Sequence, residues 1–201
     1  MIFRVVLLLF CLAFIPQVHA KPVIMVFGDS LSAGYGLPTG KGWVNLLQQR
    51  IDQRQLGYEV INASISGDTT SGGLNRLNQA LQKHRPVLVI IELGANDGLR
   101  GLSLKEMRQN LEQMVDKVKA TTAHVLLVGM EMPPNYGIAF TRRFKQTYDN
   151  ISEEKSVPLV PFLMEGFASD MKYFQRDRVH PNVDAQILIL DNVWPSLEKM
   201  L

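Results

Sequence analysis

Three residues of types that together can perform acyl transfer stand in polar segments of this sequence. Ser30 lies in residues 28–36 (GDSLSAGYG), where glycines permit a tight turn that exposes the hydroxyl. His180 follows Asp177 by three residues, so the carboxylate can hold the imidazole Nδ1–H while Nε2 accepts a proton. The pattern predicts a nucleophile, a general base and an acid that orients the base.

The chemistry of these residues, taken alone, leaves other interpretations open. Residues 28–36 could form a plain tight turn or a phosphate-binding turn, but they have neither the G-x-x-x-x-G-K-[ST] nor the G-x-G-x-x-G spacing. They also lack the G-x-S-x-G pattern of ordinary α/β-hydrolases, because Ser32 stands at the second glycine position. Asp177 and His180 could instead form a surface ion pair. They could also bind a metal ion, but no residue at a suitable spacing supplies a third ligand.

The elements that must position these residues alternate short apolar runs with longer amphipathic ones, which is typical of βα units. Three continuous apolar runs predict strands buried on both faces, and two weaker runs predict strands near the sheet edges. The predicted strands are residues 23–27, 58–61, 87–91, 125–128 and 157–160. We therefore expect one α/β domain with a five-stranded parallel sheet.

The helices are predicted from apolar residues that recur at helical spacing. Residues 43–51 and 74–81 each carry one apolar face, and 104–118 carry a longer stripe that Ser103 and Glu106 precede as a capping box. Further helices are expected near 140–154 and 184–200, and Pro195 is expected to kink or break the last one. In an open parallel sheet, ligands bind at the carboxyl ends of the strands, so residues 28–36, 63–70 and 92–98 should face one crevice.

Length and composition exclude several classes of protein. The 201 residues suit one domain, and 46% hydrophobic with 20% charged residues excludes a disordered chain, a collagen-like repeat and a polytopic membrane protein. Lys and Arg number 21 against 19 Asp and Glu, and a net charge of +2 gives no sign of a nucleic-acid partner.

The N-terminus predicts a secretory signal peptide over residues 1–20. Arg4 precedes eleven apolar residues, which are too few to span a membrane, and Ala20 supplies a small residue before the cut. Cys11 is the only cysteine and lies in this segment, so the mature chain, residues 21–201, folds without disulfides. We expect a periplasmic or secreted protein with no stable membrane insertion after cleavage.

Four short blocks together resemble the SGNH branch of the GDSL hydrolases, in the order found in that family. They are residues 28–31 (GDSL), 66–68 (SGD), 94–97 (GAND) and 177–180 (DRVH). The resemblance implies a flavodoxin-like three-layer α/β/α arrangement and a serine hydrolase that needs no cofactor and no metal. It makes Ser30 the nucleophile, His180 the base and Asp177 its orienting acid.

The same resemblance adds residues that spacing alone does not identify. It implies an oxyanion hole built from the Ser30 N–H, the Gly67 N–H and the Asn96 side chain. Residues 129–137 and 158–163 are similar to the periplasmic thioesterase I, lysophospholipase and arylesterase group of Gram-negative bacteria, whose members act as monomers on acyl esters and thioesters. The substrate-binding residues expected beside the triad are Asp29, Leu31, Asp97, Pro134, Asn135 and Tyr136.

Three alternative functions remain at this stage. A carbohydrate O-deacetylase would use the same triad on acetyl groups. A non-catalytic periplasmic acyl or lipid carrier would keep a groove without needing Asp177 and His180. A nucleotide-binding module is disfavoured, because the lysine of a phosphate loop is missing.

Overall fold

The computed structural model describes residues 20–201. The predicted signal peptide, except its last residue, and Cys11 lie outside the described residues. Within them the chain folds around one five-stranded sheet whose strands all pair in parallel, as predicted. The strands are β1 (Val23–Gly28), β2 (Glu59–Asn62), β3 (Leu88–Glu92), β4 (His124–Val128) and β5 (Leu159–Val160).

The strand order is β2-β1-β3-β4-β5, which is the flavodoxin-like order. β1, β3 and β4 are almost wholly buried, because helices cover the sheet on both sides. β2 and β5 occupy the two edges, as their weaker apolar runs predict, and β5 has only two residues after Pro158.

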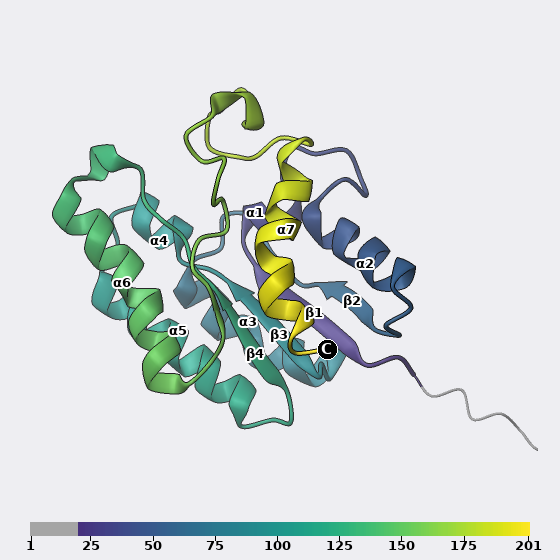
Figure 1. Ribbon diagram of the computed structural model, residues 1–201. Coiled ribbons are helices and arrows are strands. Elements are labelled where there is room, and N and C mark those ends of the chain that lie inside the picture. Colours follow the sequence, from purple (N-terminus) through teal and green to yellow (C-terminus); the bar gives the residue numbers. More distant parts are fainter. Residues whose placement is uncertain (1–19) are drawn as a thin grey trace, which may run out of the picture.

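Helices form a layer on each face of the sheet (Figure 1). α3 packs against α5, and α5 against α6, on one face, while α2 and α7 pack together on the other. The result is the three-layer α/β/α arrangement expected from the sequence. The helices of the described residues are α1 (Ser30–Ala33), α2 (Trp43–Gln53), α3 (Thr70–His84), α4 (Ala95–Leu99), α5 (Leu104–Lys119), α6 (Ile138–Lys155) and α7 (Ala185–Glu198), with short 3-10 turns η1 (Pro134–Tyr136) and η2 (Met171–Tyr173).

The helix ends agree with the sequence signals except in α7. The Ser103 hydroxyl accepts the Glu106 N–H, which is the first half of the predicted capping box. The predicted break at Pro195 is wrong, because α7 continues through it to Glu198. Trp194 and Leu197, on either side of the proline, are buried in the core, and this packing holds the last turn in place. No helix among residues 20–201 is both long and apolar enough to cross a membrane.

Candidate active site

Ser30, His180 and Asp177 meet at the carboxyl edge of the sheet although 150 positions separate the serine from the histidine. His180 Nε2 lies 2.9 Å from Ser30 Oγ, and His180 Nδ1 lies 2.7 Å from Asp177 Oδ2. The Tyr35 ring packs beside the imidazole, with ring centroids 4.6 Å apart. A hydroxyl, an imidazole and a carboxylate are therefore aligned for proton transfer away from the serine.

The Asp177 carboxylate is held as an anion by its own loop. Its Oδ1 accepts the backbone N–H groups of Val179 and His180 at 2.9 and 3.0 Å. Burial alone would raise the pKa of Asp177, but these two N–H groups and the His180 side chain together lower it to about 2. The carboxylate thus stays charged at any pH where the imidazole is neutral, and it fixes the Nδ1–H tautomer.

Ser30 stands where β1 turns sharply into α1. Asp29 caps the helix, because its Oδ1 accepts the Leu31 N–H at 3.0 Å. Gly28 leaves room for a carboxyl group beneath the turn, since a Cβ at this position would lie 2.6 Å from Glu92 Oε2. The end of β1, the Asp29 cap and the absence of a side chain at Gly28 together place the Ser30 hydroxyl at the open edge of the sheet.

Three groups near Ser30 can donate hydrogen bonds to an oxyanion. Neither the Ser30 N–H nor the Gly67 N–H donates to an acceptor within residues 20–201. The Asn96 amide is different, because its Nδ2 donates both to Asp29 Oδ2 and to the Asp68 carbonyl, each at 3.0 Å. An oxyanion that binds Asn96 must therefore replace one of these two acceptors.

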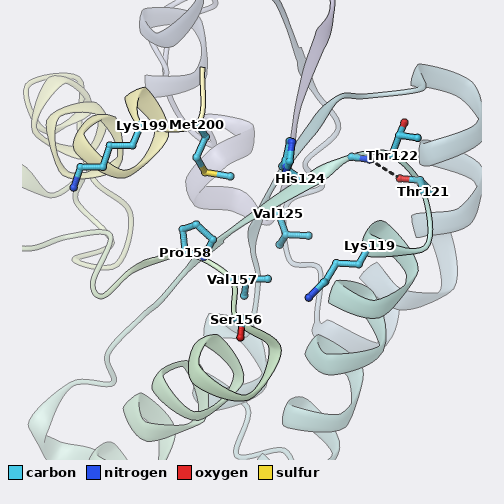
Figure 2. A pocket seen from close by; sticks show the side chains of 11 residues that line it. Lys119, Thr121, Thr122, His124, Val125, Ser156, Val157, Pro158, Lys199 and Met200 are labelled. Atoms are coloured by element: carbon cyan, nitrogen blue, oxygen red, sulfur yellow. Dashed lines mark hydrogen bonds between the residues drawn. The ribbon is translucent and has the colours of Figure 1, made fainter.

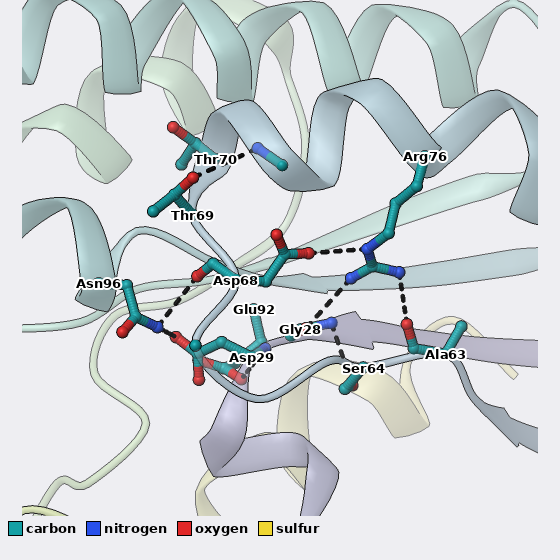
Figure 3. A network of polar contacts seen from close by, with 12 residues as sticks. Gly28, Asp29, Ala63, Ser64, Asp68, Thr69, Thr70, Arg76, Glu92 and Asn96 are labelled. Carbon is teal, nitrogen blue, oxygen red and sulfur yellow. Dashed lines mark hydrogen bonds and ion pairs between the residues drawn. The ribbon is translucent and has the colours of Figure 1, made fainter.

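A single arginine ties together the segments that carry Ser30 and Gly67 (Figure 3). Arg76 on α3 donates to Asp68 Oδ2 at 2.7 Å, to the Ala63 carbonyl at 2.5 Å and to the Gly28 carbonyl at 3.3 Å. Its guanidinium also lies over the Phe27 ring, 3.8 Å from the centroid. Arg76 thus fixes the relative positions of the carboxyl end of β1, the carboxyl end of β2 and the loop that contains Gly67.

Two buried carboxyl groups lie beneath the serine turn. The side chains of Asp29 and Glu92 have no exposed surface, and Glu92 Oε2 accepts the Ser32 hydroxyl at 2.7 Å. Burial raises the pKa of Asp29 to about 6, although the Leu31 N–H and the Asn96 amide oppose the shift. Burial and the neighbouring Asp29 raise the pKa of Glu92 well above its ordinary value. Glu92 is therefore neutral at a pH where Asp177 is fully charged.

A cavity of about 550 Å³ opens beside Ser30 and His180 at this edge. Its walls are mainly apolar and include four methionines, Met130, Met132, Met164 and Met171, together with Phe162 and Phe174. Asp29, Leu31, Asn96 and Pro134, which the sequence analysis expected near the substrate, all contribute to the lining. The cavity is large and apolar enough to receive an acyl chain.

Three predicted substrate-binding residues lie outside this lining. Asp97 is buried, and its carboxylate accepts the Thr70 N–H at 2.8 Å and the Thr70 hydroxyl at 2.6 Å, so it anchors the start of α3. Asn135 and Tyr136 sit in the exposed turn η1, where the Tyr136 hydroxyl donates to the Leu99 carbonyl. The structure thus brings Asp29, Leu31 and Pro134 to the cavity, whereas the other three predicted residues do not line it.

A second cavity, of about 640 Å³, lies at the opposite, amino end of β4 and β5 (Figure 2). Its lining includes Lys119, His124 and Ser156. Figure 2 shows the Ser156 hydroxyl and the His124 ring well apart, with Val125 and Val157 between them, and no hydrogen bond joins the two side chains. No cluster of three metal-ligating side chains occurs in the part of the chain that the structure describes.

Glu92 and Arg76 are the site residues that sequence analysis missed. Glu92 had a usable signal, because a carboxyl group directly after a buried apolar strand needs a compensating contact. Arg76 had none, since it is one of 21 basic residues and its partners come from three separate segments.

Comparisons with known proteins identify the family of this chain. Residues 26–186 match the GDSL-like Lipase/Acylhydrolase family. The chain is 45% identical over 200 residues to Esterase TesA of Pseudomonas aeruginosa, covering 98% of this chain and 100% of that protein. It is 42% identical to an arylesterase of Vibrio mimicus, covering 96% of each. The crystal structure of the psychrotrophic esterase EstA from Pseudoalteromonas sp., inhibited by monoethylphosphonate, superposes with a TM-score of 0.85 at 43% identity and covers 90% of this chain and 98% of EstA. The chain therefore belongs to the GDSL-like lipase/acylhydrolase family.

Proposed function

We propose that this protein is a serine esterase and thioesterase in which Ser30, His180 and Asp177 form the catalytic triad. The observation that carries the proposal is the hydrogen-bonded chain from Asp177 Oδ2 through the His180 ring to Ser30 Oγ, with steps of 2.7 and 2.9 Å. The relatives named esterase and arylesterase support the same class of reaction.

The reaction proceeds in two half-cycles. Ser30 Oγ attacks the carbonyl carbon while His180 Nε2 takes its proton, and collapse of the tetrahedral intermediate transfers that proton to the leaving alcohol or thiol. Water then gives its proton to His180 and attacks the acyl-enzyme, which releases the acid and restores the Ser30 hydroxyl. The mechanism calls for no cofactor.

The oxyanion of each intermediate is proposed to bind the Ser30 N–H, the Gly67 N–H and the Asn96 amide. Support comes from the two backbone donors, which have no acceptor within residues 20–201. The Asn96 amide would exchange the Asp68 carbonyl for the oxyanion and keep Asp29 as its second acceptor.

The substrates are proposed to be small-molecule acyl esters, including aryl esters, acyl thioesters and lysophospholipids. The apolar lining of the 550 Å³ cavity supports an acyl chain longer than acetyl, which disfavours the O-deacetylase. A non-catalytic carrier is also disfavoured, because it would not need the aligned imidazole and carboxylate.

We further propose that the mature protein, residues 21–201, works as a monomer in the periplasm or outside the cell. This rests on the predicted signal peptide. N-terminal sequencing of the exported protein should read Lys21 first, whereas a sequence starting at Met1 would contradict cleavage.

An organophosphonate tests the nucleophile directly. The wild-type protein should gain one phosphonyl group on Ser30 and lose p-nitrophenyl ester turnover, while Ser30→Ala should do neither. Ser169→Ala is the matched control, because Ser169 also lines the cavity and should leave both labelling and turnover intact. Wild-type turnover by purified Ser30→Ala would exclude the proposed mechanism. A chain-length series from acetyl to palmitoyl esters then separates the esterase from a deacetylase.

A further inference from the structure

Large apolar side chains that face solvent gather at one edge of the molecule. Among residues 20–201, eleven such side chains are exposed, and nine of them lie between the carboxyl end of a strand and the first residue of the next long helix. The two exceptions are Leu56, before β2, and Ile187, on α7. Soluble proteins rarely concentrate exposed apolar groups in this way without a partner.

Six of these side chains line the 550 Å³ cavity or stand in the segments that line it, and we call them the apolar rim. Leu99, Met171 and Val179 also line the cavity itself, and Tyr35 packs on the His180 ring. The Tyr136 hydroxyl reaches the Leu99 carbonyl, which joins the segment after β4 to the segment after β3. The apolar rim consists of Tyr35, Leu99, Tyr136, Ile138, Met171 and Val179, and Ile138 is 85% exposed.

Basic side chains lie in the same segments as the apolar rim. Arg100, Arg142, Arg143, Arg176 and Arg178 are exposed, and none forms an ion pair with a carboxylate of residues 20–201. Several acidic groups of this edge are already paired, as Asp170 is with Lys172 and Glu131 with Lys145. Glu165 and Asp184 of this edge are exposed and form no ion pair within residues 20–201, so the five arginines leave the edge with an excess of positive charge.

We propose that the apolar rim and its arginines form a docking surface for an anionic lipid bilayer. Exposed apolar side chains flanked by arginines are suited to a lipid–water interface, where the apolar groups enter the acyl boundary and the cations meet acidic headgroups. Docking in this orientation would turn the mouth of the cavity toward the lipid. The inference extends the proposed function by giving it a surface at which to act, but the docking itself needs no Ser30 chemistry.

A second copy of the chain is a poorer occupant of this surface. A two-fold interface would bring the same patch of each copy together and so oppose the arginines of one protomer to those of its partner. Anionic headgroups neutralise this charge, whereas a self-complementary interface concentrates it.

Vesicle flotation with the Ser30→Ala protein tests the proposal without hydrolysis of the lipid. Phosphatidylglycerol and phosphatidylcholine vesicles are compared at low salt. The protein should float with phosphatidylglycerol, bind phosphatidylcholine much less, and detach from phosphatidylglycerol as salt is raised, because anionic headgroups supply the attraction. Failure of the mature Ser30→Ala protein, residues 21–201, to float with phosphatidylglycerol at low salt would overturn the proposal.

Matched variants locate the surface on the molecule. Arg142→Glu/Arg143→Glu should weaken binding by at least about 25-fold, since each basic residue near an anionic surface contributes about fivefold. Lys83→Glu/Lys199→Glu changes the net charge equally but lies elsewhere, so it should bind far better. Ile138→Glu should also lose binding, while Ile187→Glu, which places the same change on α7, should retain it. Equal losses in the rim variants and their controls would overturn the location.

Two further readouts separate this inference from its competitors. Ile138→Glu and Arg142→Glu/Arg143→Glu, made with Ser30 intact, should hydrolyse a soluble short-chain p-nitrophenyl ester at the wild-type rate, because these residues lie outside the cavity lining. Normal ester turnover by the wild-type protein, with no vesicle binding by the Ser30→Ala protein whose rim is intact, would overturn docking and leave the proposed function standing. A dimer in sedimentation that Ile138→Glu abolishes, with no vesicle binding, would assign the apolar rim to a second copy instead.

Discussion

Two aspartates on either side of Ser30 meet opposite electrostatic conditions. Asp177 lies in a loop, with its side chain 39% exposed, and three hydrogen-bond donors lower its pKa to about 2. Asp29 has no exposed surface, and burial raises its pKa to about 6. The same side chain is thus a permanent anion at one position and a group that titrates close to neutral pH at the other.

The difference follows from what each carboxylate contacts. Asp177 faces the imidazole, and in the proposed mechanism a fixed negative charge there stabilises the imidazolium that forms when Ser30 attacks. Asp29 faces the Asn96 amide and shares its buried site with Glu92. In the proposed mechanism one carboxylate supplies charge to the reaction, whereas the other holds the Asn96 amide in position.

Loss of charge at Asp177 should give the largest effect. Asp177→Asn removes the negative charge and allows the amide to favour the wrong imidazole tautomer, so kcat should fall by about 10⁴-fold, as in other triads. The fold should be kept, because asparagine can still accept the Val179 and His180 N–H groups. Steady-state kinetics with a p-nitrophenyl ester measures the effect. A decrease of less than tenfold would contradict the orienting role.

Removal of the Asn96 amide should rank second. Asn96→Ala deletes one of the three proposed oxyanion donors, and such losses cost about 10²–10³-fold in kcat. Since the amide is proposed to act in the transition state, KM should change little. A raised KM with an unaltered kcat would show that Asn96 binds the ground state instead.

The sequence predicted the sheet and the meeting of Ser30, His180 and Asp177 well, because both predictions depend on local patterns. Continuous apolar runs identify β1, β3 and β4, and the three-residue spacing of Asp177 and His180 places both in one loop. It predicted the surroundings less well. The Asp29 carboxylate accepts a hydrogen bond from Asn96, which lies 67 positions away in the sequence. The Asp97 carboxylate accepts one from Thr70, which belongs to another element. Such pairings are set by how the loops pack, which the spacing of residues along the chain does not record.

Neutralisation of Asp29 should have a smaller effect on turnover and a distinct effect on stability. Asp29→Asn places an amide where Leu31 and Asn96 both need an acceptor, so the loss of one hydrogen bond should lower kcat by about tenfold. The folded protein holds the Asp29 proton more tightly than the unfolded chain does, because its pKa rises from 3.8 to about 6. Its contribution to stability is therefore complete below pH 3.8 and is lost as the pH rises through 6.

The size of that stability change can be measured by urea unfolding between pH 4 and 8. A rise in the pKa from 3.8 to about 6 corresponds to about 3 kcal/mol in the free energy of unfolding. The free energy of unfolding of Asp29→Asn, relative to that of wild type, should therefore increase by most of this amount between pH 4 and 8. Asp52→Asn, a change at an exposed aspartate, is the control and should follow the wild-type curve. Parallel curves for Asp29→Asn and wild type would show that Asp29 does not titrate in this range.

Replacement of Glu92 by glutamine should affect turnover least of all, although this carboxyl group is as deeply buried as Asp29. Burial and the neighbouring Asp29 raise the pKa of Glu92 well above its ordinary value and so favour the protonated form, which a neutral glutamine resembles, and the glutamine can still accept the Ser32 hydroxyl. In the unfolded chain the carboxyl group ionises, and the folded protein thus loses stability relative to the unfolded chain as the pH rises above the ordinary value of 4.5. Glu92→Gln removes this loss, so the free energy of unfolding of the variant, relative to that of wild type at the same pH, should be higher at pH 8 than at pH 5. The variant should turn over esters within a few-fold of the wild-type rate. A large loss of kcat with unchanged stability would mean that Glu92 is needed as an anion, and the division between the charge at Asp177 and the position held by Asp29 would then fail.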